Sequence, residues 1–190
     1  AEDGFGHLIS RQRGAYSLGR VALLEGTYYN TKERDRDAVQ ALNQAIEYAR
    51  QALEGEPFSE GYRLLADAYS QMMLSRGLFY MARHGDDAKE AAFRALELDP
   101  RNPRAHISVA GFYLNAPSIA GGDTAKGIEL LEEGIDLEGI GRNERFLMSI
   151  WLTKGHRELG NLDAARRYLR IAEDIYPRSP QVELLNSELQ

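Results

Sequence analysis

Small and apolar residues recur along the chain with the spacing of amphipathic helices. Three stretches place them at i, i+4 and i+7, with a proline five residues later: Ala45-Ala49-Ala52 before Pro57, Ala88-Ala92-Ala95 before Pro100, and Ala165-Leu169-Ala172 before Pro177. A fourth stretch, Gly127-Leu131-Gly134, keeps the spacing without the proline. Residues at this spacing share one helix face, and small ones let a neighbouring helix approach closely. The pattern predicts four packed helices.

Two proline-rich segments, residues 99–103 and 176–180, have nearly the same sequence and separate such helices. The first proline of each ends a helix, because it has no N–H and disfavours helical geometry at the residue before it. The second suits the first turn of the next helix, where a missing donor costs nothing. Asn102 and Ser179 are then the expected N-caps.

A second motif follows the turns. Tyr62…Leu65-Ala66…Tyr69 aligns with His106…Val109-Ala110…Tyr113, and its small residue recurs at positions 19, 66, 110 and 153. A recurrence of roughly 43 to 47 residues, with two helices in each unit, is typical of a helical-repeat array. The predicted helices lie near 7–25, 33–54, 59–83, 86–98, 103–115, 123–137, 142–159, 162–175 and 180–189.

These motifs resemble the tetratricopeptide repeat (TPR) over residues 13 to 180. The first-helix pattern is matched by Tyr62-x2-Leu65-Ala66-x2-Tyr69, and the second by Ala165-x3-Leu169-x2-Ala172-x4-Pro177. The usual period is about 34 residues, so each unit carries an insertion between its helices, including 71–85 and 116–122. The resemblance implies an all-α superhelical array of about four helix pairs. We expect one domain over 1–190, with units near 7–57, 58–100, 101–139 and 140–177 and a capping helix over 179–190.

Composition narrows the functional classes. The chain has 23 Lys and Arg against 29 Asp and Glu, a formal net charge of −6, which argues against a nucleic-acid partner. It has no cysteine, which excludes disulfides, thiolate metal sites and cysteine nucleophiles. No apolar run is long enough for a transmembrane segment. The sequence begins at Ala1 and not at Met, so we expect either a cleaved signal peptide or a trimmed sequence.

No motif indicates catalysis, a metal or a cofactor. The four histidines are scattered, and His106 and His156 occupy the aromatic positions of the first-helix motif, which favours packed, hydrogen-bonded structural roles. Residues 116–127 lack the order of a phosphate-binding loop. We interpret them as a rigid insertion in which Pro117 fixes the entry, Gly121-Gly122 turns the chain and Asp123 caps the next helix. We therefore expect a protein that is not an enzyme.

In TPR proteins, the first helix of each pair lines a concave face. The resemblance therefore implies a protein or peptide partner bound there, with arginines anchoring carboxylates. The sequence departs from the Lys/Asn pattern of members that clamp a peptide's terminal carboxylate. The candidate groove positions are Arg20, Arg63, Asp67, Gln71, Asn115, Lys154 and Arg157, and the neighbouring inner positions include Arg13 and Tyr16.

The segment Pro117-x2-Gly-Gly-Asp123 is also similar to insertions in two divergent TPR groups: the periplasmic T-component lipoproteins of TRAP transporters, and the regulator-of-microtubule-dynamics-like proteins. The first group implies an alternative function, an envelope accessory protein that binds a small solute as an oligomer. It favours the periplasm or cell envelope over the cytoplasm. The second group implies only a scaffold. The apolar run 72–81 predicts either a helix packed on its neighbours or, where exposed, self-association, so a homo-oligomer stays open.

Overall fold

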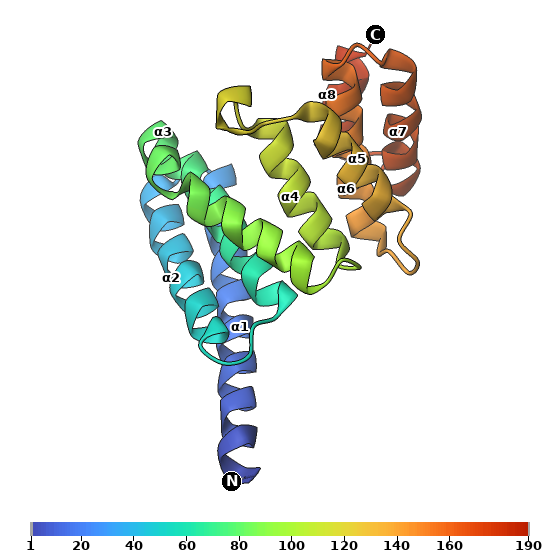
Figure 1. Cartoon of the computed structure of the whole chain (residues 1–190). Coiled ribbons are helices and arrows are strands. Elements are labelled where there is room, and N and C mark those ends of the chain that lie inside the picture. Colours follow the sequence, from blue (N-terminus) through green and yellow to red (C-terminus); the bar gives the residue numbers. More distant parts are fainter. Residues whose placement is uncertain (1, 190) are drawn as a thin grey trace. The chain divides into compact units, whose positions relative to one another are not determined.

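The computed structural model describes residues 2–189, with the side chains of residues 2–9 left out of the description. Within that range the chain is all helical and has no strand. Figure 1 shows the elements: α1 (Glu2–Thr31), α2 (Asp35–Leu53), α3 (Ser59–Leu98), α4 (Pro103–Asn115), the short 3-10 helix η1 (Ser118–Ala120), α5 (Thr124–Ile135), α6 (Arg142–Glu158), α7 (Leu162–Ile175) and α8 (Pro180–Glu188). None of the described helices is both long and apolar enough to cross a membrane.

The chain divides into two compact units, Ala1–Pro100 and Arg101–Gln190. The first contains α1 to α3 and the second α4 to α8. Counting the two halves of α3 separately, the described helices form two pairs in each unit, and α8 follows the last pair. The single repeat domain predicted over 1–190 stays a prediction.

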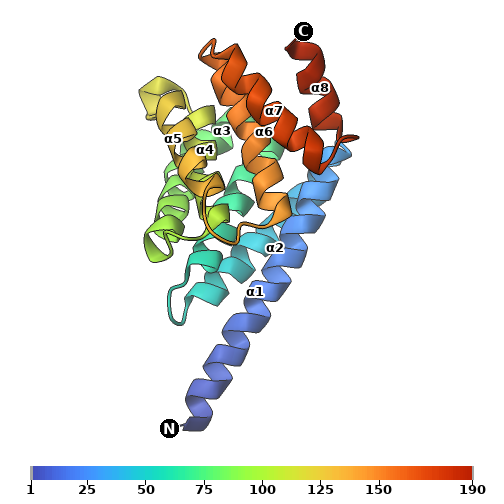
Figure 2. The same ribbon diagram turned by 90° about the vertical axis from the view of Figure 1, so that its right-hand side faces the viewer.

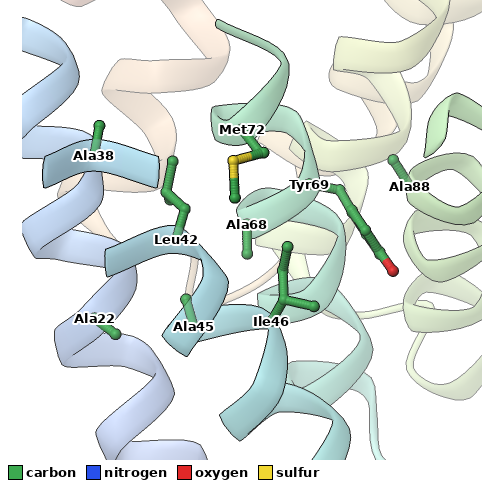
Figure 3. Close-up of a cluster of buried hydrophobic side chains, with 9 residues drawn as sticks. All are labelled: Ala22, Ala38, Leu42, Ala45, Ile46, Ala68, Tyr69, Met72 and Ala88. Carbon is green, nitrogen blue, oxygen red and sulfur yellow. The ribbon is translucent and has the colours of Figure 1, made fainter. Parts of the chain in front are cut away.

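The core of the first unit lies where α1, α2 and α3 meet. Figure 3 shows its side chains converging from these helices: Ala22, Ala38, Leu42, Ala45, Ile46, Ala68, Tyr69, Met72 and Ala88. The small residues of the predicted stripe on α2, Ala45 and Ala49, are fully buried. At Gly26 of α1 a methyl group would lie only 2.5 Å from Cγ of Leu42. The small residues thus set how closely these helices pack.

α3 is two helices that meet at Gly77, where the backbone has φ 69° and ψ −161°. The second half runs back along the first: the hydroxyl of Ser59 donates to the carbonyl of Ala95 at 2.8 Å, and the ring of Tyr69 stacks on His84 at 5.6 Å. The two helices predicted over residues 59–98 are therefore present as a pair. Its turn was predicted wrongly at His84-Gly85, with Asp86 as the cap, because an apolar run conceals the glycine that reverses the chain.

The run 72–81 splits between the two predicted roles. Met72 is buried in the core, whereas Leu74, Leu78 and Phe79 are 71%, 79% and 88% exposed around the turn at Gly77. The first part of the run therefore packs on its neighbours, and the turn presents apolar side chains to solvent.

In the second unit the helix pairs α4/α5 and α6/α7 pack against each other (Figure 2). Two clusters of buried side chains form the core of this unit. As predicted, Asn102 caps α4 by accepting from the amides of Arg104 and Ala105 at 3.0 and 3.3 Å. Ser179 is the N-cap residue of α8, as predicted, but its side chain makes no cap hydrogen bond. One cluster of buried side chains joins α4, α5, α6 and α7, and the other joins α6, α7 and α8.

The insertion before α5 has the predicted build. Pro117 precedes η1, Gly121 adopts a left-handed φ of 89°, and the carboxylate of Asp123 accepts from the amide of Lys126 at 3.2 Å. At Gly122 a methyl group would overlap the carbonyl oxygen of Ala116. The turn therefore admits only glycine there.

Gly77 provides a test of the turn in α3. Its backbone lies in a region that is open essentially only to glycine, so Gly77→Ala should lower the free energy of unfolding by about 1–3 kcal/mol. Gly85 lies within the second half of the same helix, and a methyl group there would meet nothing closer than Cγ of Met81 at 4.0 Å. The matched change Gly85→Ala should be neutral or stabilising by up to about 1 kcal/mol. Denaturant unfolding measures both, and an equal cost at the two positions would contradict the placement of the turn.

Candidate partner-binding faces

In the first unit the predicted residues lie on two neighbouring helices. Arg20 is on α1, while Arg63, Asp67 and Gln71 are on the first half of α3. A chain of polar contacts connects the two helices. The hydroxyl of Tyr16 donates to Oε2 of Glu60 at 2.7 Å, and Nε of Arg63 donates to the same oxygen at 2.9 Å.

Arg63 lies at the centre of this chain, with only 4% of its surface exposed. Its other end donates to the carboxylate of Asp67. Burial on its own would lower the pKa of Arg63, but the carboxylates of Asp67 and Glu60 more than offset it, and the pKa is raised. The guanidinium is therefore a permanent buried charge that two carboxylates of its own helix neutralise.

Tyr16 completes the link from the α1 side. Its ring packs edge-on against Phe58, with centroids 5.5 Å apart. Burial, and then the hydrogen bond to Glu60, raise the pKa of Tyr16 above its ordinary value. The hydroxyl thus stays protonated at neutral pH and acts as the donor that joins α1 to α3.

A second link lies further along the two helices. The amide of Asn30 on α1 donates to the backbone carbonyl and side-chain oxygen of Gln71, at 3.0 and 3.1 Å. The hydroxyl of Ser75 donates to Oδ1 of Asn30 at 2.5 Å. We call these two links together the α1–α3 ladder: Tyr16, Asn30, Glu60, Arg63, Asp67, Gln71 and Ser75.

Beside the ladder, α1 presents side chains to solvent. Arg13 and Arg20 are exposed, and Leu24 is 67% exposed. The guanidinium of Arg20 lies 5.8 Å from the ring centroid of Tyr16. Positions 13, 20 and 24 are separated by seven and four residues, so they share one helix face. That face carries two cations and an apolar side chain.

In the second unit, Asn115 lies at the end of α4 and is exposed, and its amide donates to the carbonyl of Gly111 at 2.6 Å. Lys154 and Arg157 lie on α6 and are half-buried. The ammonium of Lys154 is 5.1 Å from the ring centroid of Trp151, and Arg157 forms an ion pair with Glu188 of α8. Each of these groups therefore already has a partner within its own unit.

A surface pocket of about 510 Å³ opens in the second unit beside the insertion. Its walls come from the ends of α4 and α6 and the start of α5: Tyr113, Leu114, Ala116, Pro117, Ser118, Gly122, Asp123, Thr124, Ala125, Glu158 and Leu159. The charged side chains among these are Asp123 and Glu158, both acidic. Small-molecule sites are mostly apolar and enclosed, and this pocket is mainly polar.

The two histidines of the first-helix motif are both buried. Nδ1 of His106 lies 3.1 Å from the carbonyl oxygen of Asn102, so the predicted hydrogen-bonded role is confirmed there. The ring of His156 stacks on Tyr168 at 5.4 Å, and its Nε2 lies 3.4 Å from Oε1 of Glu132. Among the described residues neither ring nitrogen of His156 has a hydrogen bond, so that part of the prediction was wrong.

The sequence interpretation missed how the ladder is built. Arg63 was assigned to the concave face by its register, and Glu60 and Tyr16 were given no part in holding it. A signal existed, because Glu60, Arg63 and Asp67 are spaced i, i+3 and i+7, which brings both carboxylates beside the arginine on one helix face. Whether the candidate groove residues contact a partner stays a prediction.

Replacing Arg63 tests the ladder. Arg63→Met keeps most of the buried stem but removes the charge between Glu60 and Asp67. It should lower the free energy of unfolding by about 3 kcal/mol, the lower end for breaking a buried pair, because both carboxylates are about a third exposed. Arg94→Met is the control, since Arg94 pairs with Glu97 on the solvent side of the same helix. If denaturant unfolding showed equal effects for both variants, the ladder would not hold the helices together.

A solved TPR protein has a similar fold. A thermophilic TPR protein of Thermus thermophilus matches with a TM-score of 0.57 and 17% sequence identity, over 90% of this chain and 98% of its own. PilF of Pseudomonas aeruginosa is 14% identical over 92% of this chain and 99% of its own, but its TM-score of 0.26 is too low to carry a structural argument. No protein-family model and no curated protein sequence matches the chain. The likeness to the Thermus protein confirms the predicted fold.

Proposed function

We propose that this chain, which has the fold of tetratricopeptide-repeat proteins, is a non-catalytic scaffold that binds a protein or peptide on the exposed face of its first helices. In the first unit that face is formed by α1 and the first half of α3. In the second it is formed by α4 and α6. The proposal concerns protein partners and involves neither a cofactor nor nucleic acid.

The observation that carries the proposal is the α1–α3 ladder. It joins two neighbouring first helices at Tyr16–Glu60 and again at Asn30–Gln71. Contacts at two points along a helix fix its rotation as well as its distance from its neighbour. A face fixed in this way loses little conformational freedom when a partner binds, which favours affinity.

The side chains beside the ladder define the chemistry of the partner. Arg13 and Arg20 are exposed on the face of α1 that also carries Leu24. Guanidinium groups form paired hydrogen bonds with carboxylates. We therefore infer a peptide that presents acidic side chains or a terminal carboxylate next to an apolar residue. This face also depends on Arg63, Asp67 and Gln71, which hold in place the two helices that carry it.

The second unit contributes a smaller set of contacts. Asn115 is exposed, and Lys154 and Arg157 are half-buried on α6. Arg157 is paired with Glu188, so an acidic group of the partner would replace that carboxylate rather than meet a bare cation. The net gain from this exchange is small, and the first unit provides most of the binding energy in this proposal. The pocket of this unit is polar and acidic, so it does not support the alternative function of binding a small solute.

Selection from a random peptide library tests the proposal with purified protein. Peptides enriched on the wild-type chain should carry acidic residues near an apolar one. Arg13→Ala combined with Arg20→Ala should weaken their binding at least about tenfold, which corresponds to about 1.4 kcal/mol. The control combines Arg36→Ala on α2 with Arg83→Ala on the second half of α3, two exposed arginines elsewhere in the unit. It removes the same charge, so a general electrostatic effect would weaken both variants alike.

Two results would count against the proposal. One is the absence of any enriched peptide on the folded wild-type chain. The other is enrichment of peptides whose affinity is the same for the wild type and for the Arg13, Arg20 double variant. Circular dichroism of each variant confirms that loss of binding is not loss of the fold.

A further inference from the structure

One side of α1 carries large apolar side chains that no helix of its unit covers. Leu18, Val21 and Tyr28 are 52%, 58% and 56% exposed. They belong to a row of residues three and four positions apart, which we call the outer seam of α1: Arg11, Gly14, Leu18, Val21, Glu25 and Tyr28. Such spacing places the whole row along one helix face.

The position of the outer seam follows from the contacts of α1. Tyr16 and Asn30 reach α3, and Ala22 packs in the cluster that contains Ala38 and Leu42 of α2. At about 100° per residue, the seam lies on the side of α1 opposite α3. This is the edge of the first unit on which a further helix would continue the stack.

A helix face that no neighbour covers is normally polar, as in an amphipathic helix. α2 follows this rule, since its exposed positions include Arg36, Gln40, Asn43, Gln44 and Glu47. The outer seam of α1 does not. Three large apolar side chains within about three turns of a face that no helix of the unit covers indicate a surface that another helix covers.

We propose that the outer seam of α1 binds the outer seam of a second copy of this chain, with the two α1 helices antiparallel. A two-fold axis between positions 19 and 20 then brings Leu18 against Val21 of the second copy, and Val21 against its Leu18. Such an interface is self-complementary, as two-fold symmetry requires. This surface is separate from the face that carries the proposed peptide binding, which uses Arg13, Arg20 and Leu24.

The charges of the seam select both the partner and the orientation. Arg11 lies at one end and Glu25 near the other, so the antiparallel pair places Arg11 beside Glu25 and Tyr28 of the second copy. A guanidinium is attracted by the carboxylate and by the face of the tyrosine ring. A parallel pair would instead set arginine against arginine and glutamate against glutamate. Arg11 also lies 3.7 Å from Glu54, but both side chains are about two thirds exposed, so this pair is weak.

Gly14 supplies room at the place where Glu25 of the second copy would lie. A methyl group built on Gly14 would meet nothing within 4 Å. The helix backbones can therefore approach closely at this point, while the apolar pair at the centre of the seam excludes water. The two-fold axis makes the two ends of the dimer interface equivalent, so each contact of the seam occurs twice in the dimer.

Sedimentation equilibrium on the purified chain tests the pairing. The wild type should form a dimer, and Val21→Lys should raise the dimer dissociation constant at least about tenfold, or about 1.4 kcal/mol. Leu78→Lys is the matched control, because Leu78 is an exposed apolar residue at the turn of α3, and it should leave the constant unchanged. A wild type that stays monomeric at the highest concentration reached would overturn the proposal. So would a dimer that Leu78→Lys weakens and Val21→Lys does not.

Charge reversal tests the contacts at the ends of the seam. Glu25→Arg should weaken the dimer by setting arginine beside arginine, and adding Arg11→Glu should restore it by exchanging the two charges. Failure of the double variant to recover would contradict the pairing of Arg11 with Glu25. Circular dichroism confirms that each variant is folded, which is expected because all the altered side chains are exposed.

The orientation has its own readout, because the chain contains no cysteine. In a variant with Gly14→Cys and Glu25→Cys, an antiparallel dimer should form disulfides between position 14 of one copy and position 25 of the other on oxidation. These positions are about 16 Å apart within one helix, too far for a bond inside one chain. Mass spectrometry that found only 14–14 and 25–25 links would overturn the antiparallel arrangement.

Discussion

The buried guanidinium of Arg63 is the constraint on which the first unit depends. A charge that is almost wholly removed from water must be neutralised, and Glu60 and Asp67 do so from one turn before and one turn after it. With Glu60 held in this way, its oxygen is in place to accept from Tyr16 of α1. The exposed face of α1 is thus oriented by an interaction that lies beneath it.

Close packing at small residues makes this arrangement possible in both units. In the first, Gly26 allows Leu42 to reach the backbone of α1. In the second, a methyl group at Gly155 of α6 would lie 2.9 Å from Cγ1 of Ile128 on α5. The same device therefore recurs one helix pair after another. The sequence repeat therefore reflects recurring close contacts between helices at small residues. The polar surface residues can differ from one helix pair to the next.

The sequence was sufficient for the architecture because that architecture depends on local rules. Helix-spaced alanines, proline stops and the caps at Asn102 and Asp123 each act within a few residues, and they predicted the helix pairs. The turn at Gly77 was missed because Gly77 lies inside an apolar run, whereas His84-Gly85 has the composition of a turn. The non-helical backbone of Gly77, the hydrogen bond from Ser59 to Ala95 and the packing of Tyr69 against His84 together place the turn at Gly77.

The candidate face was harder to predict for a related reason. Register placed Arg63 on the inner side of its helix, but burial depends on neighbouring elements that register does not specify. For positions that stay exposed, such as Arg20, contact with a partner remains a proposal. Arg63 instead acts from below the surface, because Tyr16 and its own carboxylates enclose it.

Hydrogen exchange of the backbone amides in the free protein tests most directly whether the face of the first unit is fixed before a partner binds. If the face is fixed, amides of α1 between residues 14 and 30 and those of residues 59–76 should be protected together. Arg63→Met should accelerate exchange in both segments and leave α6 and α7 unchanged. Fast exchange of α1 in the wild type, or protection that Arg63→Met does not alter, would contradict a face that is fixed before binding.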